Sequence, residues 1–432
     1  MKSYPKMKDS GIEWIGEIPG HWESKRLKFS TNLMTKKSNI ETNSIPYLGL
    51  ENIESNTATL IDVNNEMEES DAKLFQKNNV LFGKLRPYLA KVWLASFDGR
   101  CSNEFLILEG RNYEPNFLKS LLISDGCIKT IDSSTYGAKM PRAEWSFIGN
   151  MLFPLPKQDE QKQISDYLDS QTKLIDSQIE SNQKLVTLLQ EKRQATINHA
   201  VTKGLDPNVP MKDSGIEWIG EIPGHWEIRP ISKSTNKITN GFVGPTRDIL
   251  VKYGIRYLQS TYIKNGQILF NEKYFVTKEW NSKHSKSILQ ENDVLLVQTG
   301  ANVGQCAAVT KEFEGCNCHA LIIIQLIEKL GNGFYLSYLL RSNYGINYLH
   351  SIETGALHPH LEIGYVKEMP ILFPKIDEQR QIVNFLDKKT IEIDELIDMT
   401  NCQIEKLQEF RQSLISAAVT GKIDVRKEVI AQ

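Results

Sequence analysis

The sequence lacks the features that mark secreted and membrane proteins. Only 6 cysteines occur in 432 residues, too few for a disulfide framework in so long a chain, so we expect reduced thiols. No apolar run approaches the roughly 18 to 20 residues of a membrane-spanning helix. The first ten residues also lack the apolar core of a secretory signal. These absences predict a soluble protein of the cytoplasm.

The usual catalytic motifs are missing too. The sequence contains no G-x-x-x-x-G-K-[ST] phosphate loop, no G-x-G-x-x-G fingerprint, no G-x-S-x-G elbow and no Asn-Pro-Pro-aromatic tetrad. The cluster Cys316-Asn317-Cys318-His319 is the best metal candidate, but a site would need a second ligand pair at a suitable spacing. When the two halves of the chain are compared, Cys316 falls opposite Cys101, which favours structural cysteines. We therefore expect no catalytic centre, no metal and no cofactor bound by this chain.

Charge of one sign is not dominant, since the net charge is −2. Its distribution is uneven. Residues 24–150 carry 16 basic and 15 acidic side chains, and residues 228–370 carry 15 and 11. This bias favours these two segments as the parts that face an anion.

What the sequence does have is an internal repeat. Residues 7–23 read MKDSGIEWIGEIPGHWE, and residues 211–227 repeat these 17 letters without a change. Residues 159–206 then match residues 377–424 without a gap, at an offset of 218. The segments between these blocks differ in sequence and in length. The chain thus consists of two units that share a framework and differ in their middles.

Each second block predicts a long helix. Apolar residues recur at steps of three, four and seven, which is a heptad-like stripe, and Gly204 and Gly421 close the two helices. About 42 residues at 1.5 Å each give a rod of roughly 60 Å. A stripe this narrow favours a single partner helix, which would be the other copy; the alternative is packing of each helix on its own domain. The predicted packing residues are Ile164, Leu168, Ile175, Ile179, Leu189, Ile382, Leu386, Ile393, Ile397 and Leu407.

The divergent segments predict mixed α/β modules. Residues 79–95 and 293–309 each read as strand, turn and strand. Buried strands are expected at 105–108 and 321–326, and helices at 113–123 and 333–340. Short Gly-Ala-x-x-Pro elements at 137–141 and 355–359 precede the return to the long helices.

Basic side chains with aromatic neighbours lie in both divergent segments. Such groups suit phosphate contact and base-edge readout, although a solvated surface is the better explanation for any one of them. As a set they favour contact with a polyanion. The candidates are Lys84, Arg86, Lys91, Lys139, Arg142, Arg247, Lys252, Arg256, Lys283, Lys286, His358 and His360. The tryptophans of the 17-residue repeat favour a structural clamp, with a protein-docking surface as the alternative.

These pieces resemble a known family. The segment G-I-E-W-I-G-E-I-P-G-H-W-E before a variable domain is similar to the start of a target recognition domain. Pro154-Leu155-Pro156 with Asp159-Glu160-Gln161, and Pro374 with Asp377-Glu378-Gln379, resemble the helical regions of that family. Asn79 to Trp93, with its Lys-Leu-Arg-Pro-Tyr-Leu core, is similar to a strand pair of its domains, and Val294 to Gly304 resembles the Gly-rich variant of that pair. Nearly the whole chain resembles the specificity subunit of a type I restriction–modification enzyme. No short tandem repeat follows Gly204-Leu205-Asp206-Pro207, which bears on spacer length alone.

The resemblance implies an α+β fold with a pseudo-two-fold internal repeat. Residues 1–156 and 207–374 would be target recognition domains, and residues 157–206 and 375–432 would be helices that pair antiparallel as a coiled coil. Each domain would read half of a bipartite, asymmetric DNA site. Two methyltransferase subunits and motor-nuclease subunits would use S-adenosylmethionine, ATP and Mg²⁺, while this chain would have no active site.

Two other readings stay open on the residues alone. One is a coiled-coil scaffold that binds only proteins, without direct base readout. The other is a nuclease or methyltransferase in its own right, which turnover by the isolated chain would reveal. Paired helices with a domain at each end resemble a dimeric DNA reader with two half-sites, which favours the DNA-binding interpretation.

Overall fold

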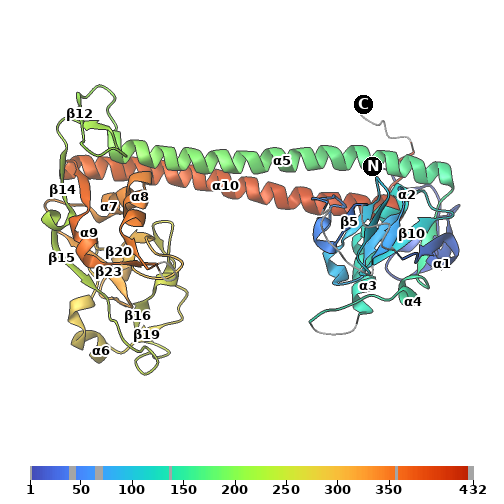
Figure 1. Ribbon diagram of the computed structural model, residues 1–432, viewed down its shortest axis with the longest axis horizontal. Helices are drawn as coiled ribbons and strands as arrows, with labels where there is room; N and C mark the ends of the chain where they lie inside the picture. Colours follow the sequence, from blue (N-terminus) through green and yellow to red (C-terminus); the bar gives the residue numbers. More distant parts are fainter. Residues whose placement is uncertain (1, 38–44, 64–71, 136–138, 356–358, 427–432) are drawn as a thin grey trace. The chain divides into compact units, whose positions relative to one another are not determined.

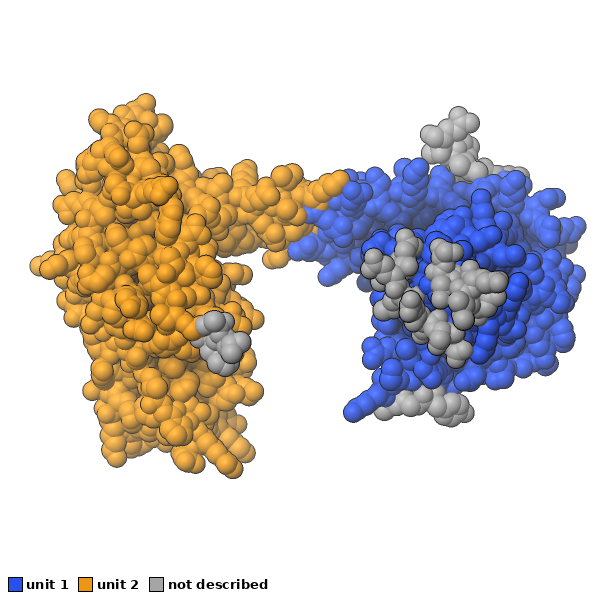
Figure 2. All heavy atoms as spheres, in the orientation of Figure 1, with its two compact units in different colours: residues 1–183, 401–432 blue, residues 184–400 orange. Residues whose placement is uncertain are grey.

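The chain folds into two compact units. The computed structural model describes residues 2–37, 45–63, 72–135, 139–355 and 359–426. Unit 1 comprises residues 1–183 and 401–432, and unit 2 comprises residues 184–400 (Figure 2). Among the described residues, no helix combines the length and the apolar character needed to cross a membrane.

A four-stranded antiparallel sheet is the centre of unit 1. Its order is β4–β10–β7–β8, formed by Thr31–Met34, Phe105–Gly110, Val80–Gly83 and Val92–Leu94. Val80 and Phe82 face one core with the helices α2 (Pro115–Ile123) and α3 (Asp125–Ser133). Leu81 faces a second core beside the small sheet β5–β9–β6 (Tyr47–Leu48, Gly99–Cys101, Lys73–Phe75). The alternation explains why these strands are apolar on both faces.

Unit 2 repeats this plan. Its central sheet has the order β15–β23–β20–β21, formed by Thr235–Asn240, Leu321–Leu326, Val294–Val297 and Cys306–Ala308. Helices α7 (Gly333–Leu340) and α8 (Asn343–Ser351) cover one face. The small sheet β19–β16–β22 (Phe275–Val276, Ile255–Leu258, Asn317–Cys318) belongs to the other side.

Shorter elements connect these layers. In unit 1 they are β1 (Met7–Ile12), β2 (Gly16–Pro19), β3 (Glu23–Arg26), α1 (Leu27–Ser30), η2 (Leu50–Asn52), η3 (Pro87–Leu89), α4 (Trp145–Ile148) and β11 (Leu152–Leu155). In unit 2 they are β12 (Met211–Asp213), β13 (Glu221–Pro223), β14 (Glu227–Pro230), η4 (Ile231–Ser234), η5 (Ser260–Tyr262), β17 (Ile263–Lys264), β18 (Gln267–Ile268), α6 (Lys278–Lys283), η6 (Ser285–Ser287), η7 (Lys311–Phe313), β24 (Glu353–Thr354), β25 (His360–Leu361), α9 (Ile363–Glu368) and β26 (Pro370–Phe373). In both units the 17-residue repeat begins with a hairpin, β1–β2 or β12–β13.

Two long helices are shared between the units. Helix α5 spans Gln158–Lys203 and helix α10 spans Ile376–Val419, which confirms the two predicted helices (Figure 1). Acidic residues occupy the first turn of each, where the helix dipole favours negative charge. Gly204, with φ +77°, follows the end of α5 in the left-handed conformation that commonly terminates helices.

The two helices run antiparallel, since α5 begins in unit 1 and ends in unit 2 while α10 does the reverse, and an ion pair joins them in each unit. In unit 1 the Arg411 Nε lies 2.8 Å from the Asp176 Oδ1. In unit 2 the Arg193 Nε lies 2.9 Å from the Asp394 Oδ1. Arg193 and Arg411 occupy the same place in the repeat, as do Asp176 and Asp394, so the two pairs are counterparts.

The apolar stripe faces the interior at the ends of the helices and less so in their middles. Of the predicted packing residues, Ile164, Leu168, Ile175, Ile382, Leu386 and Ile393 are buried, and Ile179, Ile397, Leu189 and Leu407 are half-buried. A polar residue interrupts the stripe at the same place in both helices and is itself buried, as Asn182 in α5 and as Thr400 in α10. The mixed α/β class, the strands at 105–108 and 321–326 and the helix at 333–340 are all confirmed.

Candidate DNA interface

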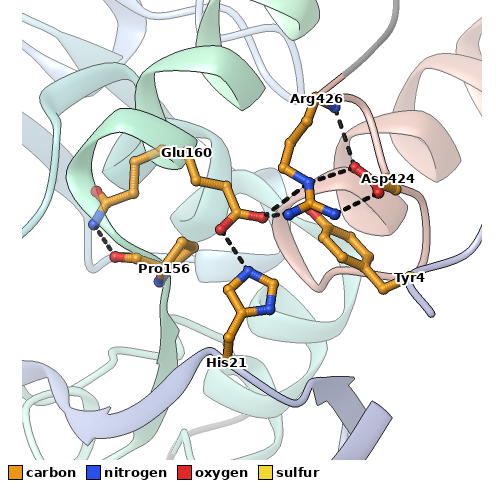
Figure 3. A network of polar contacts seen from close by, with 7 residues as sticks. Tyr4, His21, Pro156, Glu160, Asp424 and Arg426 are labelled. Atoms are coloured by element: carbon orange, nitrogen blue, oxygen red, sulfur yellow. Dashed lines mark hydrogen bonds and ion pairs between the residues drawn. The ribbon is translucent and has the colours of Figure 1, made fainter. Parts of the chain in front are cut away.

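A buried carboxylate fastens the 17-residue repeat to the start of each long helix. In unit 1 the Glu160 carboxylate accepts hydrogen bonds from the Tyr4 hydroxyl at 2.8 Å and pairs with the His21 Nε2 at 2.8 Å (Figure 3). Arg426 lies 3.9 Å from the same carboxylate and stacks over the Tyr4 ring. This contact explains why a histidine and a glutamate recur in both copies of the framework.

The counterpart in unit 2 has fewer partners. The Glu378 carboxylate pairs with the His225 Nε2 at 2.9 Å and accepts the Trp226 indole N–H at 2.9 Å. In unit 1 the Tyr4 hydroxyl donates to the Glu160 Oε1, the equivalent of the Glu378 oxygen that accepts from Trp226. The Trp22 indole N–H therefore has no partner among the described residues. The Glu160 side chain is 8% exposed and the Glu378 side chain 25%.

The glutamine that follows connects the helix behind the sheet to the long helix. The Gln161 carbonyl accepts the backbone N–H of Glu114, the N-cap residue of α2, at 2.8 Å. Its amide donates to the carbonyls of Asn112 and Pro156, both at 2.9 Å. Gln379 does the same for Asn332, the N-cap residue of α7. The Asp-Glu-Gln signature is therefore a joint that fixes each domain on its helix.

A five-residue turn between β7 and β8 carries the most prominent predicted cation. The turn begins at Arg86 with φ 52° and ends at Ala90 with φ 47°, both in the left-handed region. Residues returning toward α5 are bonded to it: the Arg86 N–H donates to the Pro141 carbonyl and the Ala143 N–H to the Lys84 carbonyl, both at 2.8 Å. The two loops thus form one ledge at an end of the sheet.

Unit 2 builds the same ledge from other residues. Gly300 (φ +87°) and Gly304 (φ +82°) stand where Arg86 and Ala90 stand in unit 1. The Gly300 N–H donates to the Pro359 carbonyl at 3.3 Å, and the Leu361 N–H donates to the Gln298 carbonyl at 2.9 Å. Backbone geometry is kept while the outward side chains change.

The guanidinium of Arg86 is available to a ligand. The residue is exposed, and within the described part of the chain its side chain meets no hydrogen-bond or ion-pair partner. A non-glycine residue at this φ costs about 1–2 kcal/mol relative to glycine. Unit 2 uses glycine at the same place, so the fold tolerates it. Strain retained at an exposed arginine is a pointer to function.

The other cations predicted in unit 1 differ in their surroundings. Lys139 is exposed and Lys84 is half-buried. Arg142 is exposed and pairs with Glu104 at 2.7 Å. The Lys91 ammonium donates to the carbonyls of Leu50 and Ile53 at 2.7 and 2.8 Å, and burial lowers its pKa. Lys91 serves the fold, and its placement gives no support to its prediction as a DNA contact.

The cations predicted in unit 2 that the structure describes lie in four groups. Arg247 and Lys252 are exposed on the segment before β16. Arg256 pairs with Glu312 at 2.7 Å and lies over the rings of Phe270 and Phe313. Lys283 and Lys286 are exposed at the end of α6 and in η6. His360 is half-buried, with its Nε2 3.4 Å from the Gln298 Nε2. His358 lies outside the described residues.

Sequence reasoning missed an aromatic cluster beside the third group. The Trp280 and His284 rings stack at 3.9 Å, and Phe242 meets both rings edge-on. A buried amide pair, Asn281 with Asn317 at 3.0 Å, anchors α6 beneath them. The i, i+4 spacing of Trp280 and His284 on one helix face was the signal available in the sequence.

In each unit an arginine holds a hairpin near the small sheet: Arg411 of α10 in unit 1 and Arg341, which ends α7, in unit 2. In unit 1 the buried Arg411 donates to the carbonyls of Asn56 and Thr57 at 3.3 and 3.1 Å, in addition to its pair with Asp176. A cavity of about 900 Å³ adjoins this contact. In unit 2 the role is divided: Arg341 donates to the Asn265 carbonyl at 2.8 Å, and Arg193 pairs with Asp394.

The cysteine cluster has the chemistry of a core. Burial raises the pKa of the Cys316 thiol to about 11 and raises that of Cys318 further, which keeps both thiols protonated. No group of three or more potential metal ligands is found in the described parts of the chain. The strand register also corrects the sequence comparison, because Leu48 pairs with Cys101 as Leu258 pairs with Cys318, so Cys318 and not Cys316 is the counterpart of Cys101.

Comparison with known proteins identifies the repeated plan. The family model described as the type I restriction modification DNA specificity domain matches residues 19–187 and again residues 223–407. The two matches together cover most of the chain and coincide with its two framework copies.

Relatives and solved structures agree with this match. The chain is 26% identical over 439 residues to the putative type I restriction enzyme MjaX specificity subunit of Methanocaldococcus jannaschii, covering 95% of this chain and 96% of that protein. It is 24% identical over 316 residues to the MjaVIII specificity subunit of the same organism, covering 71% and 69%. A chain in a solved structure of a type I R-M system has a TM-score of 0.73 at 18% identity, covering 94% and 99%, which shows a shared fold.

Proposed function

The chain belongs to the type I restriction modification DNA specificity family, and from this premise we propose that its two units read the two halves of one bipartite, asymmetric DNA site. The chain is a specificity subunit and not an enzyme. We assign adenine-N6 methylation and ATP-dependent cleavage to other subunits of the complex. The target recognition domains are residues 1–156 and 207–374. The helices of residues 157–206 and 375–432 set their spacing.

One observation carries the proposal that the halves differ. Both units present the same ledge with the same backbone hydrogen bonds, yet Arg86 faces outward in one and Gly300 in the other. Arg142 likewise corresponds to His360. An arginine can bind the major-groove edge of a guanine through two hydrogen bonds, and a glycine cannot. Two ledges with equal geometry and unequal side chains suit two unequal half-sites.

Partner subunits have an available surface on the helices. Leu185 and Leu188 of α5 and Leu396 and Met399 of α10 are exposed, all of them in unit 2. Exposed apolar residues on paired helices are typical of a protein-docking face. We assign this face to methyltransferase subunits, with motor-nuclease subunits joining the assembly.

The cofactors follow from this division of labour. The chain itself binds none, and S-adenosylmethionine, ATP and Mg²⁺ are used by the partner subunits. The complex works on cellular DNA, which places it in the cytoplasm.

The decisive experiment is the adenine-methylation motif of genomic DNA from cells that express this chain with its methyltransferase subunit. We expect a bipartite motif that is not a palindrome. Loss of methylation when the chain is omitted completes the test. A palindromic motif, or methylation without this chain, would contradict the proposal.

Arg86→Ala tests the ledge at single-residue resolution. We expect a loss of about 1–3 kcal/mol in binding, confined to one half-site, measured by titrating the complex with duplexes that have either half-site scrambled. Arg86→Gly should lose the same affinity without backbone strain, and Arg26→Ala, at an exposed arginine outside the ledge, is the matched control. Equal loss at both half-sites would make Arg86 a general phosphate contact.

Salt dependence separates this reading from a protein-only scaffold. Phosphate contacts release counterions, so the logarithm of the binding constant should fall linearly with the logarithm of salt concentration. A binding constant of the complex for its duplex that does not change with salt concentration would favour the protein-only scaffold.

A further inference from the structure

The two identical copies of the 17-residue repeat bury their first tryptophan differently. In unit 1 the Trp14 ring packs on Phe153, edge-on with ring centroids 6.2 Å apart. Its other neighbour is Gly126 of α3, where the indole leaves no room for a Cβ atom. In unit 2 the equivalent Trp218 is 53% exposed. Since the two segments share every letter, the cause lies in what surrounds them.

Both neighbours of Trp14 differ in unit 2, since Ile371 replaces Phe153 and the helix that faces the repeat also changes. Ser124 and Ser342 are the N-cap residues of α3 and α8, so the second residue of each helix can be compared directly. That residue is Gly126 in unit 1 and Tyr344 in unit 2. Tyr344 is buried, and its hydroxyl donates to the Pro370 carbonyl at 2.5 Å. Unit 1 thus has a bare backbone where Trp14 packs, and unit 2 has a buried tyrosine at that position and an exposed Trp218.

The surroundings of Trp218 define what can bind there. Met211 on the same hairpin is also exposed. Asp213, Glu217 and Glu221 of the same hairpin are exposed, as is Asp206 shortly before it in the chain. The nearby ammonium groups are used within the fold: Lys212 donates to the Trp226 carbonyl and Lys203 to the Ile219 carbonyl at 3.3 Å. The surface is therefore apolar at its centre and negative at its rim, which suits a protein segment with lysine or arginine beside an apolar side chain and repels DNA phosphate.

We propose that Trp218 anchors a methyltransferase subunit on unit 2, through a cationic, apolar segment of that subunit. This inference rests on the proposed function, and it adds that the two ends of the chain do not hold their partners alike. Tryptophan is among the residues that contribute most to protein interfaces when it is buried on association. Unit 1 has three of these carboxylates, as Asp9, Glu13 and Glu17, but packs its tryptophan against the domain.

The test compares Trp218→Ala with Trp14→Ala in the full chain, each mixed with the methyltransferase subunit. Native mass spectrometry should show two methyltransferase subunits on the original chain and one on Trp218→Ala, with affinity for the second subunit lowered tenfold or more. The unfolding temperature of Trp218→Ala should stay unchanged, because the side chain is exposed. Trp14→Ala should instead lower the unfolding temperature, because that ring is packed.

Two further measurements support or overturn the assignment. Hydrogen exchange at residues 214–220 should slow on addition of the methyltransferase subunit, and the affinity of the weaker site should fall with salt. Unchanged assembly of Trp218→Ala would overturn the proposal, as would assembly that fails only with the motor-nuclease subunit. Loss of binding to isolated duplex DNA by the variant would also overturn it. A chain that directs methylation to a bipartite motif but assembles equally well as Trp218→Ala would reject this inference and leave the proposed function standing.

Discussion

Unit 1 holds its ledge with Arg86 and Ala90 in the left-handed conformation, whereas unit 2 holds the same ledge with Gly300 and Gly304. Glycine adopts this conformation without a steric penalty, and arginine does not. The comparison shows that the backbone conformation of this loop and its side chain serve different purposes. The hydrogen bonds to the returning loop require the backbone shape, and the side chain at its corner is left for the ligand.

A second contrast lies where the domains meet the helices. Arg411 of unit 1 is buried and binds both a carboxylate and two backbone carbonyls. Its repeat counterpart Arg193 is more exposed and has Asp394 as its acidic partner, while Arg341 takes over the carbonyl contact. Arginines at the same position of the repeat therefore make different contacts in the two units.

The largest effect on stability is expected at the two arginines of this second comparison. Arg411→Ala removes a buried guanidinium with its ion pair to Asp176 and its hydrogen bond to the Thr57 carbonyl, while the Asn56 carbonyl keeps Gln412 as a donor, so we expect the free energy of unfolding to fall by about 2–4 kcal/mol. Arg193→Ala removes a more exposed pair and should cost about 1 kcal/mol or less. Denaturant titrations of both variants give the comparison. Equal losses would show that the hairpin contact adds nothing to unit 1.

The next effect concerns a buried turn residue that differs in charge. Asn79 accepts the Gln76 N–H at 2.8 Å, and Asp293 accepts the Gln290 N–H at 2.8 Å. Burial raises the pKa of the Asp293 carboxyl to about 6, from 3.8. The folded state therefore favours the neutral acid, and this stabilisation is complete below pH 3.8 and is lost as the pH rises through 6.

Asp293→Asn should consequently stabilise the protein by about 1–3 kcal/mol at pH 8 and have little effect at pH 4. The reciprocal Asn79→Asp should destabilise it at pH 8 and not at pH 4. Thermal unfolding at the two pH values measures both. A stabilisation by Asp293→Asn that is independent of pH would mean that ionisation of the carboxyl is not its source.

A smaller effect sharpens the contrast between the ledges. Arg86→Gly should raise the unfolding free energy by about 1 kcal/mol, and Gly300→Ala should lower it by about 1–2 kcal/mol, because the left-handed backbone is kept in both. Calorimetry of the two variants tests this. If Arg86→Gly is destabilising, the arginine contributes contacts to the fold that outweigh its strain.

The smallest effect concerns the second tryptophan of the repeat. Trp226 donates its indole N–H to Glu378, while the Trp22 N–H has no acceptor in the described structure. Replacement by phenylalanine should therefore cost about 1 kcal/mol more at Trp226 than at Trp22, the difference being one hydrogen bond to a charged group. Thermal unfolding of the two single variants should resolve it, and an equal cost would indicate that the Trp22 N–H is bonded after all.

Periodicity and repetition were enough to predict the scaffold. The heptad-like stripe gave both long helices, and alternation of apolar residues gave the central strands, since these patterns record burial directly. The charge of Arg86 and its aromatic neighbours predict a DNA contact at this position. Its strained backbone could have been suspected, because the second copy places Gly300 there.

The contacts that distinguish the units could not be predicted from pattern. Arg411 meets Asn56 across 355 residues of sequence, and no local signal marks that pair. The different exposure of Trp14 and Trp218 could not be predicted from their own segments, because the two segments have the same sequence. Their surroundings differ, with Gly126 against Tyr344 and Phe153 against Ile371, and these substitutions lie in other elements whose packing against the repeat no local pattern records.

The sharing of α5 and α10 between the units has a consequence for synthesis. Unit 2 is complete once residue 400 has been made, although it begins in the middle of the chain. The core of unit 1 includes Leu414, Ile415, Ala418 and Val419 of α10. The first half of the chain therefore cannot complete its core until the last turns of α10 have been made. Contacts this distant in sequence close late. On the ribosome the second reader can mature before the first, and a prematurely ended chain would leave unit 1 without one wall of its core.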